Sequence, residues 1–362
     1  MPLDLAGITK KYRRQSQAAV SDINLILEPG RITALTGASG SGKTTLLRLI
    51  AGFEHPDLGT IRYNGDRYAD SRIHKKPQNR SITMIFQDLA LFPHLTAKKN
   101  VHFGMKRVER SRRDDISRSL FAQVQMTGFE DKYPHELSGG QRQRVALARA
   151  LASKADIILM DEPFSNLDSE LKWGLIDDIR SILSDAGKTV LFVTHDRDEA
   201  FFLADDIAVL HEGRLLQYGN IAEVFEKPAS TDVARFFGII NSLRNDRESD
   251  SQSTVLVRPD ALLVDEIIDS ESRPSALESD YPGRAIRLSG VVDTCRFMGS
   301  HWETRIRLVD SSEWKPNSRS KHLVASENRA RAAGERVSIR VPDEKMRIVG
   351  HTGIATDFDQ SK

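Results

Sequence analysis

The sequence predicts an α/β domain built on a parallel sheet, followed by a small all-β barrel. Two apolar runs, residues 157–160 and 189–194, each end at polar residues, as buried strands do. Helical patterns separate such runs, and strands that alternate with helices form a parallel sheet with its ligand at the carboxyl ends of the strands. Beyond residue 254 the pattern changes to short alternating segments between polar loops, which is typical of a small barrel.

The bulk composition narrows the class of protein. A chain of 362 residues corresponds to two domains at roughly 100–200 residues each. A net charge of +1 argues against a strongly electrostatic nucleic-acid binder. One cysteine, Cys295, excludes an intrachain disulfide and favours a reducing compartment. The N-terminus lacks a secretory signal, and the apolar runs are far shorter than the ~20 residues that span a bilayer, so we expect a cytosolic chain.

Residues 20–52 predict a strand, a turn, a second strand and then a helix. Apolar residues alternate over 20–27, Pro29-Gly30 makes a turn, and 32–36 runs into a glycine-rich loop. After that loop, apolar residues at 46, 47, 49 and 50 have helical spacing, and Gly52 ends the helix.

The loop between that strand and helix has the pattern of a phosphate-binding loop. It reads Gly37-Ala38-Ser39-Gly40-Ser41-Gly42-Lys43-Thr44. Its glycines let backbone N–H groups surround the phosphates, Lys43 adds a positive charge, and the Thr44 hydroxyl is placed to bind Mg²⁺. A Gly/Ser-rich turn with an incidental lysine is the alternative, and the strand and helix on either side disfavour it.

Two carboxylates, Asp161 and Glu162, follow the apolar run 157–160 directly. Successive side chains of a strand point to opposite faces, so the two acids face different directions at the edge of the sheet. Solvated acids that end a strand are common in α/β proteins, but here the segment 163–168, PFSNLD, follows at once. Gln87 and His195 also end strands, although a histidine in such a place is more often a packed or capping residue.

A second glycine-rich segment, Leu137-Ser138-Gly139-Gly140-Gln141, precedes a helical run over 141–152. Two glycines at the N-terminus of a helix make an anion site, with the Ser138 hydroxyl as an additional donor. Ser138 is also a good N-cap residue, and both roles are compatible.

A phosphate loop followed by LSGGQ, in this order, resembles the ATP-binding cassette (ABC) ATPases. The resemblance covers residues 1 to about 240 and, more weakly, the rest. It implies that Asp161, Thr44 and Gln87 bind Mg²⁺, that Glu162 is the base for the attacking water, and that His195 contacts the γ-phosphate and this water. It also implies that Tyr12 stacks on adenine, although a surface tyrosine beside four basic residues is an alternative. Ala38 is a departure, because many members have proline there.

The nucleotide-binding residues that the resemblance implies fall into three groups. One group is the phosphate loop with its flanking residues, the second is the strand-end glutamine, and the third consists of LSGGQ and segment 163–168, which face the ATP of a second subunit. They are Tyr12, Gly37, Ala38, Ser39, Gly40, Ser41, Gly42, Lys43, Thr44, Thr45, Gln87, Ser138, Gly139, Gly140, Gln141 and Asp168.

The same resemblance predicts the domains. An ABC ATPase domain covers 1–240 and includes a helical subdomain at about 88–155. A linker follows at 241–254, and a TOBE-like regulatory barrel, similar to an OB-fold, covers 255–350. The segments 86–96 and 133–137 are similar to bacterial solute-importer ATPases, and the barrel to sugar, polyamine and ferric-iron members. Residues 164–168 and 87–92 favour ferric iron.

The function that follows is the ATPase subunit of an importer at the cytoplasmic face of the membrane. It would bind ATP and Mg²⁺, form a homodimer, and join two membrane permease subunits and an external solute-binding protein, without binding nucleic acid. A soluble ABC ATPase acting on ribosomes or DNA is the rival hypothesis, but such proteins usually carry two cassettes or a long coiled coil, and this chain has no sustained heptads. A nucleotide sensor without turnover would be expected to lack Glu162 or His195.

Overall fold

The computed structural model describes residues 1–13, 16–105, 108–165, 167, 169–238, 240–245, 254–266, 286–310, 314–316, 322–342 and 345–349. The chain divides into two compact units, Met1–Val224 and Phe225–Lys362. Each unit has its own sheets and its own apolar core.

The first unit is built on a six-stranded sheet with the order β10-β9-β3-β8-β7-β6. Five strands are parallel, and only the edge strand β10 runs against its neighbour. This confirms the predicted parallel sheet and aligns the carboxyl ends of its strands at one edge. The strands are β3 (Ile32–Thr36), β6 (Ile82–Ile85), β7 (Ile157–Asp161), β8 (Thr189–Val193), β9 (Asp206–His211) and β10 (Arg214–Asn220).

A second, antiparallel sheet of the first unit has the order β2-β1-β4-β5. Its strands are β1 (Leu3–Lys10), β2 (Val20–Leu27), β4 (Leu58–Tyr63) and β5 (Asp66–Ala69). Side chains from this sheet, from helix α1 (Lys43–Ala51) and from the parallel sheet share one core, which fixes the N-terminus of α1 against β3. The alternation predicted over 20–27 is interrupted at Asp22, whose left-handed φ of 52° shifts the register so that Ile23 is buried.

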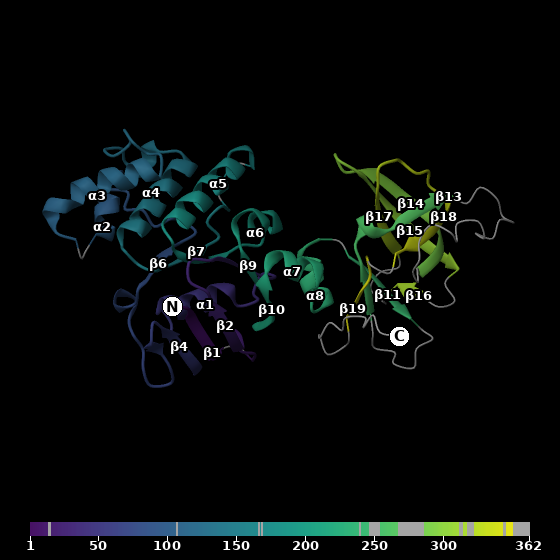
Figure 1. Cartoon of the computed structure of the whole chain (residues 1–362), viewed down its shortest axis with the longest axis horizontal. Coiled ribbons are helices and arrows are strands. Elements are labelled where there is room, and N and C mark those ends of the chain that lie inside the picture. The colour runs from purple at the N-terminus through teal and green to yellow at the C-terminus, as the bar shows by residue number, and fades with distance from the viewer. Residues whose placement is uncertain are drawn as a thin grey trace. The chain divides into compact units, whose positions relative to one another are not determined.

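Residues 88–155 are mostly helical, as predicted, and α2, α3 and α4 lie together at one end of the first unit (Figure 1). They are α2 (Ala97–Gly104), α3 (Arg110–Gln123) and α4 (Gly139–Ala152), with a short 3-10 turn at Pro134–Glu136 before α4. The other α-helices in the described part of the chain are α5 (Ser169–Asp185), α6 (Arg197–Leu203), α7 (Ile221–Glu226) and α8 (Thr231–Phe236). Among the described residues no helix is both long enough and apolar enough to cross a membrane.

The second unit contains two antiparallel sheets around one core, in agreement with the predicted all-β domain. One sheet has the order β16-β11-β12-β19 and the other β13-β18-β14-β15-β17. The strands are β11 (Asn241–Asn245), β12 (Thr254–Val257), β13 (Leu263–Glu266), β14 (Ile286–Phe297), β15 (Trp302–Asp310), β16 (Trp314–Pro316), β17 (His322–Glu327), β18 (Arg336–Val341) and β19 (Arg347–Val349).

The linker was predicted over residues 241–254, but the structure has a strand at the start of this range. Asn241–Asn245 is strand β11, and it pairs with β12 inside the second unit. The polar composition suggested a linker, but the Asn241 side chain is buried because it accepts a hydrogen bond from the Val324 N–H and donates one to the Val324 carbonyl. Residues 246–253 lie outside the described residues.

Candidate nucleotide-binding site

A cleft of about 840 Å³ opens at the N-terminus of α1, beside the carboxyl ends of β7 and β8. The predicted residues that line it are Tyr12, Ser39, Gly40, Ser41, Gly42, Lys43, Thr44, Thr45, Glu162 and His195. Residues separated by more than 180 positions in the sequence are thus brought to one cavity, because β3, β7 and β8 are neighbours in the sheet.

Two glycines of the loop are required by close approach of other backbone. Gly37 has φ 144°, and a Cβ atom there would lie 2.0 Å from the Leu210 carbonyl oxygen. Gly42 has φ 101°, and a Cβ atom there would lie 2.3 Å from the Ala19 carbonyl oxygen. Any side chain at either position would push the loop away from β9 or from the segment before β2.

Lys43 is almost buried and bends back over its own loop. Its Nζ donates to the carbonyl oxygens of Gly37 and Ala38, at 2.8 and 2.9 Å. Burial lowers the pKa of Lys43, and the negative charges of Glu162 and Asp161 oppose this shift. The ammonium group is therefore held beside the loop amides, where a phosphate would exchange the two carbonyl contacts for stronger charge-assisted bonds.

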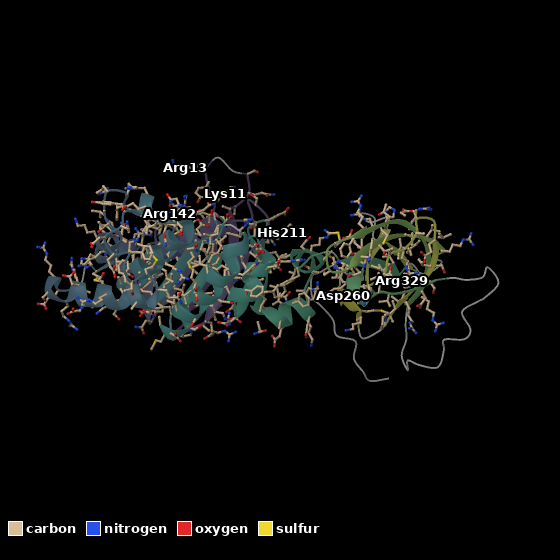
Figure 2. All side chains as sticks on the ribbon, turned by 90° about the horizontal axis from the view of Figure 1, so that it is seen from above. Lys11, Arg13, Arg142, His211, Asp260 and Arg329 are labelled. Atoms are coloured by element: carbon tan, nitrogen blue, oxygen red, sulfur yellow. The ribbon has the colours of Figure 1, made fainter. Side chains whose placement is uncertain are left out.

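Tyr12 also lines the cleft and is half-buried. Its chain neighbours Lys11 and Arg13 are exposed to solvent (Figure 2). Its hydroxyl donates a hydrogen bond to the Glu54 carboxylate. Burial and this carboxylate raise the pKa of Tyr12 above its ordinary value. The bond to Glu54 holds the phenol ring in the wall of the cleft.

The acid pair ends β7 as predicted. Glu162 adopts φ 45°, a left-handed conformation, and its N–H bonds to the Val193 carbonyl at 3.2 Å, so its position is fixed by β8. His195 Nδ1 lies 3.6 Å from Glu162 Oε1, and Gln87 Nε2 lies 3.5 Å from Glu162 Oε2. The structure thus brings Gln87, Glu162 and His195 together from three neighbouring strands of the sheet.

Thr44, Gln87 and Asp161 carry oxygen atoms of the kind that a hard divalent cation prefers. Among the described residues no cluster of three His, Cys, Asp or Glu side chains could hold a metal without further ligands. Mg²⁺ bound to a nucleotide does not need such a cage, because one or two protein oxygens complete a shell of phosphate oxygens and waters. Burial, and then the charge of Glu162, raise the pKa of Asp161, and a cation at this place would offset the repulsion between the two acids.

The N-terminus of α4 lies apart from this cleft. Ser138 and Gln141 form a capping box: Ser138 Oγ accepts the Gln141 N–H at 3.3 Å, and Gln141 Oε1 accepts the Ser138 N–H at 2.9 Å. Neither Ser138 nor Gly139, Gly140 or Gln141 lines the cleft. Asp168, the remaining predicted nucleotide-binding residue, lies outside the described residues.

Several residues that support the site were not predicted from the sequence. Arg149 of α4 donates to the carbonyl oxygens of Leu89 and Ala90, both at 2.6 Å, and these two residues have left-handed φ angles of 60° and 43°. This arginine holds the strained segment that follows Gln87. The unpredicted lining residues of the cleft are Ser16, Gln17, Ala18, Ala19, Glu212 and Gly213.

The buried Gln143 and Arg80 were not predicted either. Gln143 of α4 donates to the Pro163 carbonyl at 2.6 Å and so joins this helix to the segment after the acid pair. The Arg80 guanidinium, just before β6, donates to the carbonyls of Leu49 and Ile50 at the C-terminal end of α1. These three partners are main-chain carbonyls that lie 20 to 31 positions away, so they leave no local pattern in the sequence.

Comparisons with known proteins agree with this geometry. A family model described as ABC transporter matches residues 20–165, and one described as TOBE domain matches residues 255–349. The chain is 41% identical over 244 residues to the spermidine/putrescine import ATP-binding protein PotA of Nitratidesulfovibrio vulgaris, covering 67% of this chain but 64%, just under two thirds, of that protein.

Two further relatives carry the names of other solutes. The sulfate/thiosulfate import ATP-binding protein CysA of Thermosynechococcus vestitus is 40% identical, over 76% of this chain and 80% of its own length. The Fe(3+) ions import ATP-binding protein FbpC of Escherichia coli O157:H7 is 41% identical, over 66% of this chain and 68% of its own length.

A solved structure, the dimeric ATP-binding cassette MJ0796 bound to ADP and Pi, superimposes with a TM-score of 0.53 at 29% identity. The superposition covers 60% of this chain and 98% of that one. The phosphate loop, the acid pair, the family models and the relatives agree: the chain belongs to the ABC transporter ATPases and carries a C-terminal TOBE domain.

Proposed function

We propose that this chain is the ATP-hydrolysing subunit of a binding-protein-dependent importer. The observation that carries the proposal is the single cleft in which Lys43, Glu162 and His195 meet. A phosphate-binding loop, a carboxylate fixed by the sheet and a histidine 3.6 Å from it are the parts that hydrolysis of a phosphoanhydride needs.

Each residue then has a defined task. The loop amides and Lys43 bind the β- and γ-phosphates, and Tyr12 stacks on the adenine. Glu162 accepts a proton from the attacking water, and His195 orients that water against the γ-phosphate. Thr44, Gln87 and Asp161 are the residues that would hold Mg²⁺, which when bound neutralises charge on the phosphate oxygens.

The N-terminus of α4 serves the ATP of a second copy of the chain in this proposal. Ser138, Gly139 and Gly140 would bind an anion there, yet none of the three lines the cleft of its own chain. One phosphate loop and one LSGGQ per chain form two complete sites when two copies pair with two-fold symmetry. The solved relative MJ0796 is dimeric, which supports this homodimer, and we place Asp168 and Gln141 at the same interface.

The importer role places the chain at the cytoplasmic face of the membrane, peripheral to two permease subunits that work with an external solute-binding protein. The segment after Gln87 contributes to a groove of about 600 Å³. Its lining includes Phe86, Ala90, Phe92, Phe103 and Met105, and it would receive a helix of the permease. The TOBE domain would regulate turnover. Recovery of an integral membrane protein with the affinity-tagged chain from detergent extracts tests this role, whereas recovery of ribosomes or DNA instead would favour a soluble ABC ATPase.

The solute that we favour is ferric iron, on the motifs at 87–92 and 164–168. Relatives named for polyamine, sulfate and iron import have nearly equal identity to this chain, so the solute has to be tested directly. A deletion strain grown on limiting iron, limiting spermidine or limiting sulfate should fail only when iron is limiting. Normal growth on limiting iron, with failure on another of the three, would assign that other solute.

A further inference from the structure

Lys172 in the first turn of α5 makes two short ion pairs with residues that follow His195 in the chain. Its Nζ lies 2.7 Å from Asp196 Oδ2 and 2.6 Å from Glu199 Oε1. The side chains of Lys172 and Glu199 are only 13% and 6% exposed. Ion pairs shielded to this degree hold their geometry, unlike the solvated pairs of the surface.

The partners of Lys172 are the residues that hold His195 in place. Asp196 follows His195 directly, and its Oδ1 accepts the N–H groups of Asp198 and Glu199, which caps α6. Thr194 precedes His195, and its hydroxyl donates to Glu199 and accepts the Asp196 N–H at 3.0 Å. Both chain neighbours of the histidine are therefore fixed by one network centred on Lys172.

The charges of this network depend on the lysine. Asp196 and Glu199 bring two carboxylates to one cation, and Glu199 is almost buried while Asp196 is partly exposed. Burial alone would lower the pKa of Lys172, but the bonds to Asp196 and Glu199 outweigh it and raise this pKa, so the ammonium group remains charged. Without it, two adjacent carboxylates would repel each other next to His195.

The position of Lys172 in the chain links this network to the acid pair. Helix α5 begins at Ser169, directly after the segment 163–168 that leads away from Glu162. Lys172 thus ties the element that follows Glu162 to the turn that carries His195. His195 Nδ1 lies 3.6 Å from Glu162 Oε1, so the network of Lys172 adjoins both residues along the chain.

We propose that Lys172 is a positioning residue for ATP hydrolysis, which acts by holding His195 against Glu162. This inference rests on the proposed function, because it matters only if His195 takes part in hydrolysis. A misplacement of about 1 Å at a reacting centre can cost on the order of 100-fold in rate, so loss of the lysine should be visible in kcat.

The alternative is that Lys172 only docks α5 on α6, and the same pair of helices offers a matched control. Arg180, two turns further along α5, donates to the Leu203 carbonyl and to Asp205 Oδ1, the latter at 2.8 Å. These partners lie at and beyond the C-terminal end of α6, remote from His195. Arg180→Met should weaken the packing of the two helices but leave the histidine in place.

The test compares Lys172→Met, Lys172→Arg and Arg180→Met in the purified full-length protein. We expect Lys172→Met to lower kcat about 10- to 100-fold while the ATP dissociation constant changes by less than about twofold. Lys172→Arg, which retains the charge, should restore most of kcat, and Arg180→Met should keep it within about twofold of wild type. An unchanged kcat in Lys172→Met, or an equal loss in Arg180→Met, would overturn the inference.

A double-mutant cycle with His195→Ala separates this inference from the proposed function. If Lys172 acts through His195, adding Lys172→Met to His195→Ala should lower kcat by less than about twofold more. Two fully additive losses would refute the positioning role while leaving the proposed function standing. Wild-type turnover in His195→Ala would instead count against the proposed function itself.

Discussion

The N-termini of α1 and α4 are both rich in glycine, but they differ in how their first turns are capped. No side chain caps the first turn of α1, its N-cap Gly42 is left-handed, and the turn opens into the cleft beside Glu162 and His195. The first turn of α4 is closed by the reciprocal bonds of Ser138 and Gln141 and lies outside that cleft. The first turn of α1 therefore leaves its amides open to the cleft, whereas the first turn of α4 is capped by side chains of its own helix.

The difference also appears in the glycines themselves. At α1, Gly37 and Gly42 are required because a Cβ atom on them would lie 2.0 and 2.3 Å from carbonyl oxygens of other segments. At α4, a Cβ on Gly140 would have only an ordinary contact, 3.6 Å from Leu175 Cδ2. The packing of the chain therefore requires glycine at positions 37 and 42, whereas at position 140 it would accept a Cβ atom.

Loss of the cation at α1 should have the largest effect. Lys43→Ala removes the ammonium group that faces the phosphates, so ATP binding and hydrolysis should both disappear. Isothermal titration with ATP and a phosphate-release assay measure the two losses. Lys98→Ala, which removes an exposed ion pair with Asp114 in the helical segment, serves as the control and should behave as wild type. Wild-type turnover of Lys43→Ala would overturn the assignment of the phosphate loop.

A pair of glycine substitutions sharpens the account of the α1 loop. Both Gly37 and Gly40 have positive φ, but a Cβ on Gly40 meets no atom within 4 Å. Gly37→Ala should lower the free energy of unfolding by about 3 kcal/mol through strain and a backbone clash. Gly40→Ala should cost about 1 kcal/mol, the strain of a left-handed residue. Urea unfolding measures both, and equal costs would contradict the close packing of Gly37 against β9.

Removal of the α4 cap should have the smallest effect. Ser138→Ala deletes one member of the capping box and should lower the free energy of unfolding by about 1 kcal/mol. The affinity of the single chain for ATP should not change, because Ser138 lies outside the cleft. Thermal unfolding and nucleotide titration at low protein concentration check the two statements. A weakened ATP affinity in the monomer would mean that α4 contributes to the cleft of its own chain.

The sequence predicted the elements whose signals are local. Helix α1 follows from apolar spacing and Gly52, and β7 and β8 from apolar runs that end at polar residues. Gly290 depends instead on a contact that local patterns do not show. It lies within the continuous strand β14, and a Cβ there would lie 2.4 Å from Ile306 of β15.

The residues of the site also differ in whether a local sequence pattern predicts them. Lys43, Glu162 and His195 stand in patterns that can be read locally, and the structure places all three in the cleft. Lys172 and Arg149 act through residues 24 to 60 positions away, so their tasks follow from the packing of α5 on α6 and of α4 on the segment after Gln87. A charged residue on a helix gives no sign of such a partner until the fold is known.

The most direct test of the account uses Glu162→Gln. The amide keeps the shape of the side chain but cannot accept the proton of water, so kcat should fall about 10²–10⁴-fold while ATP still binds. Two chains should then remain closed around two unhydrolysed ATP molecules, with the N-terminus of α4 of each chain against the ATP of the other. Light scattering should show an ATP-dependent compact dimer, and adding Ser138→Arg should abolish it. A Glu162→Gln protein that turns over normally, or that keeps its nucleotide-free size at saturating ATP, would contradict both the role of Glu162 and the shared site.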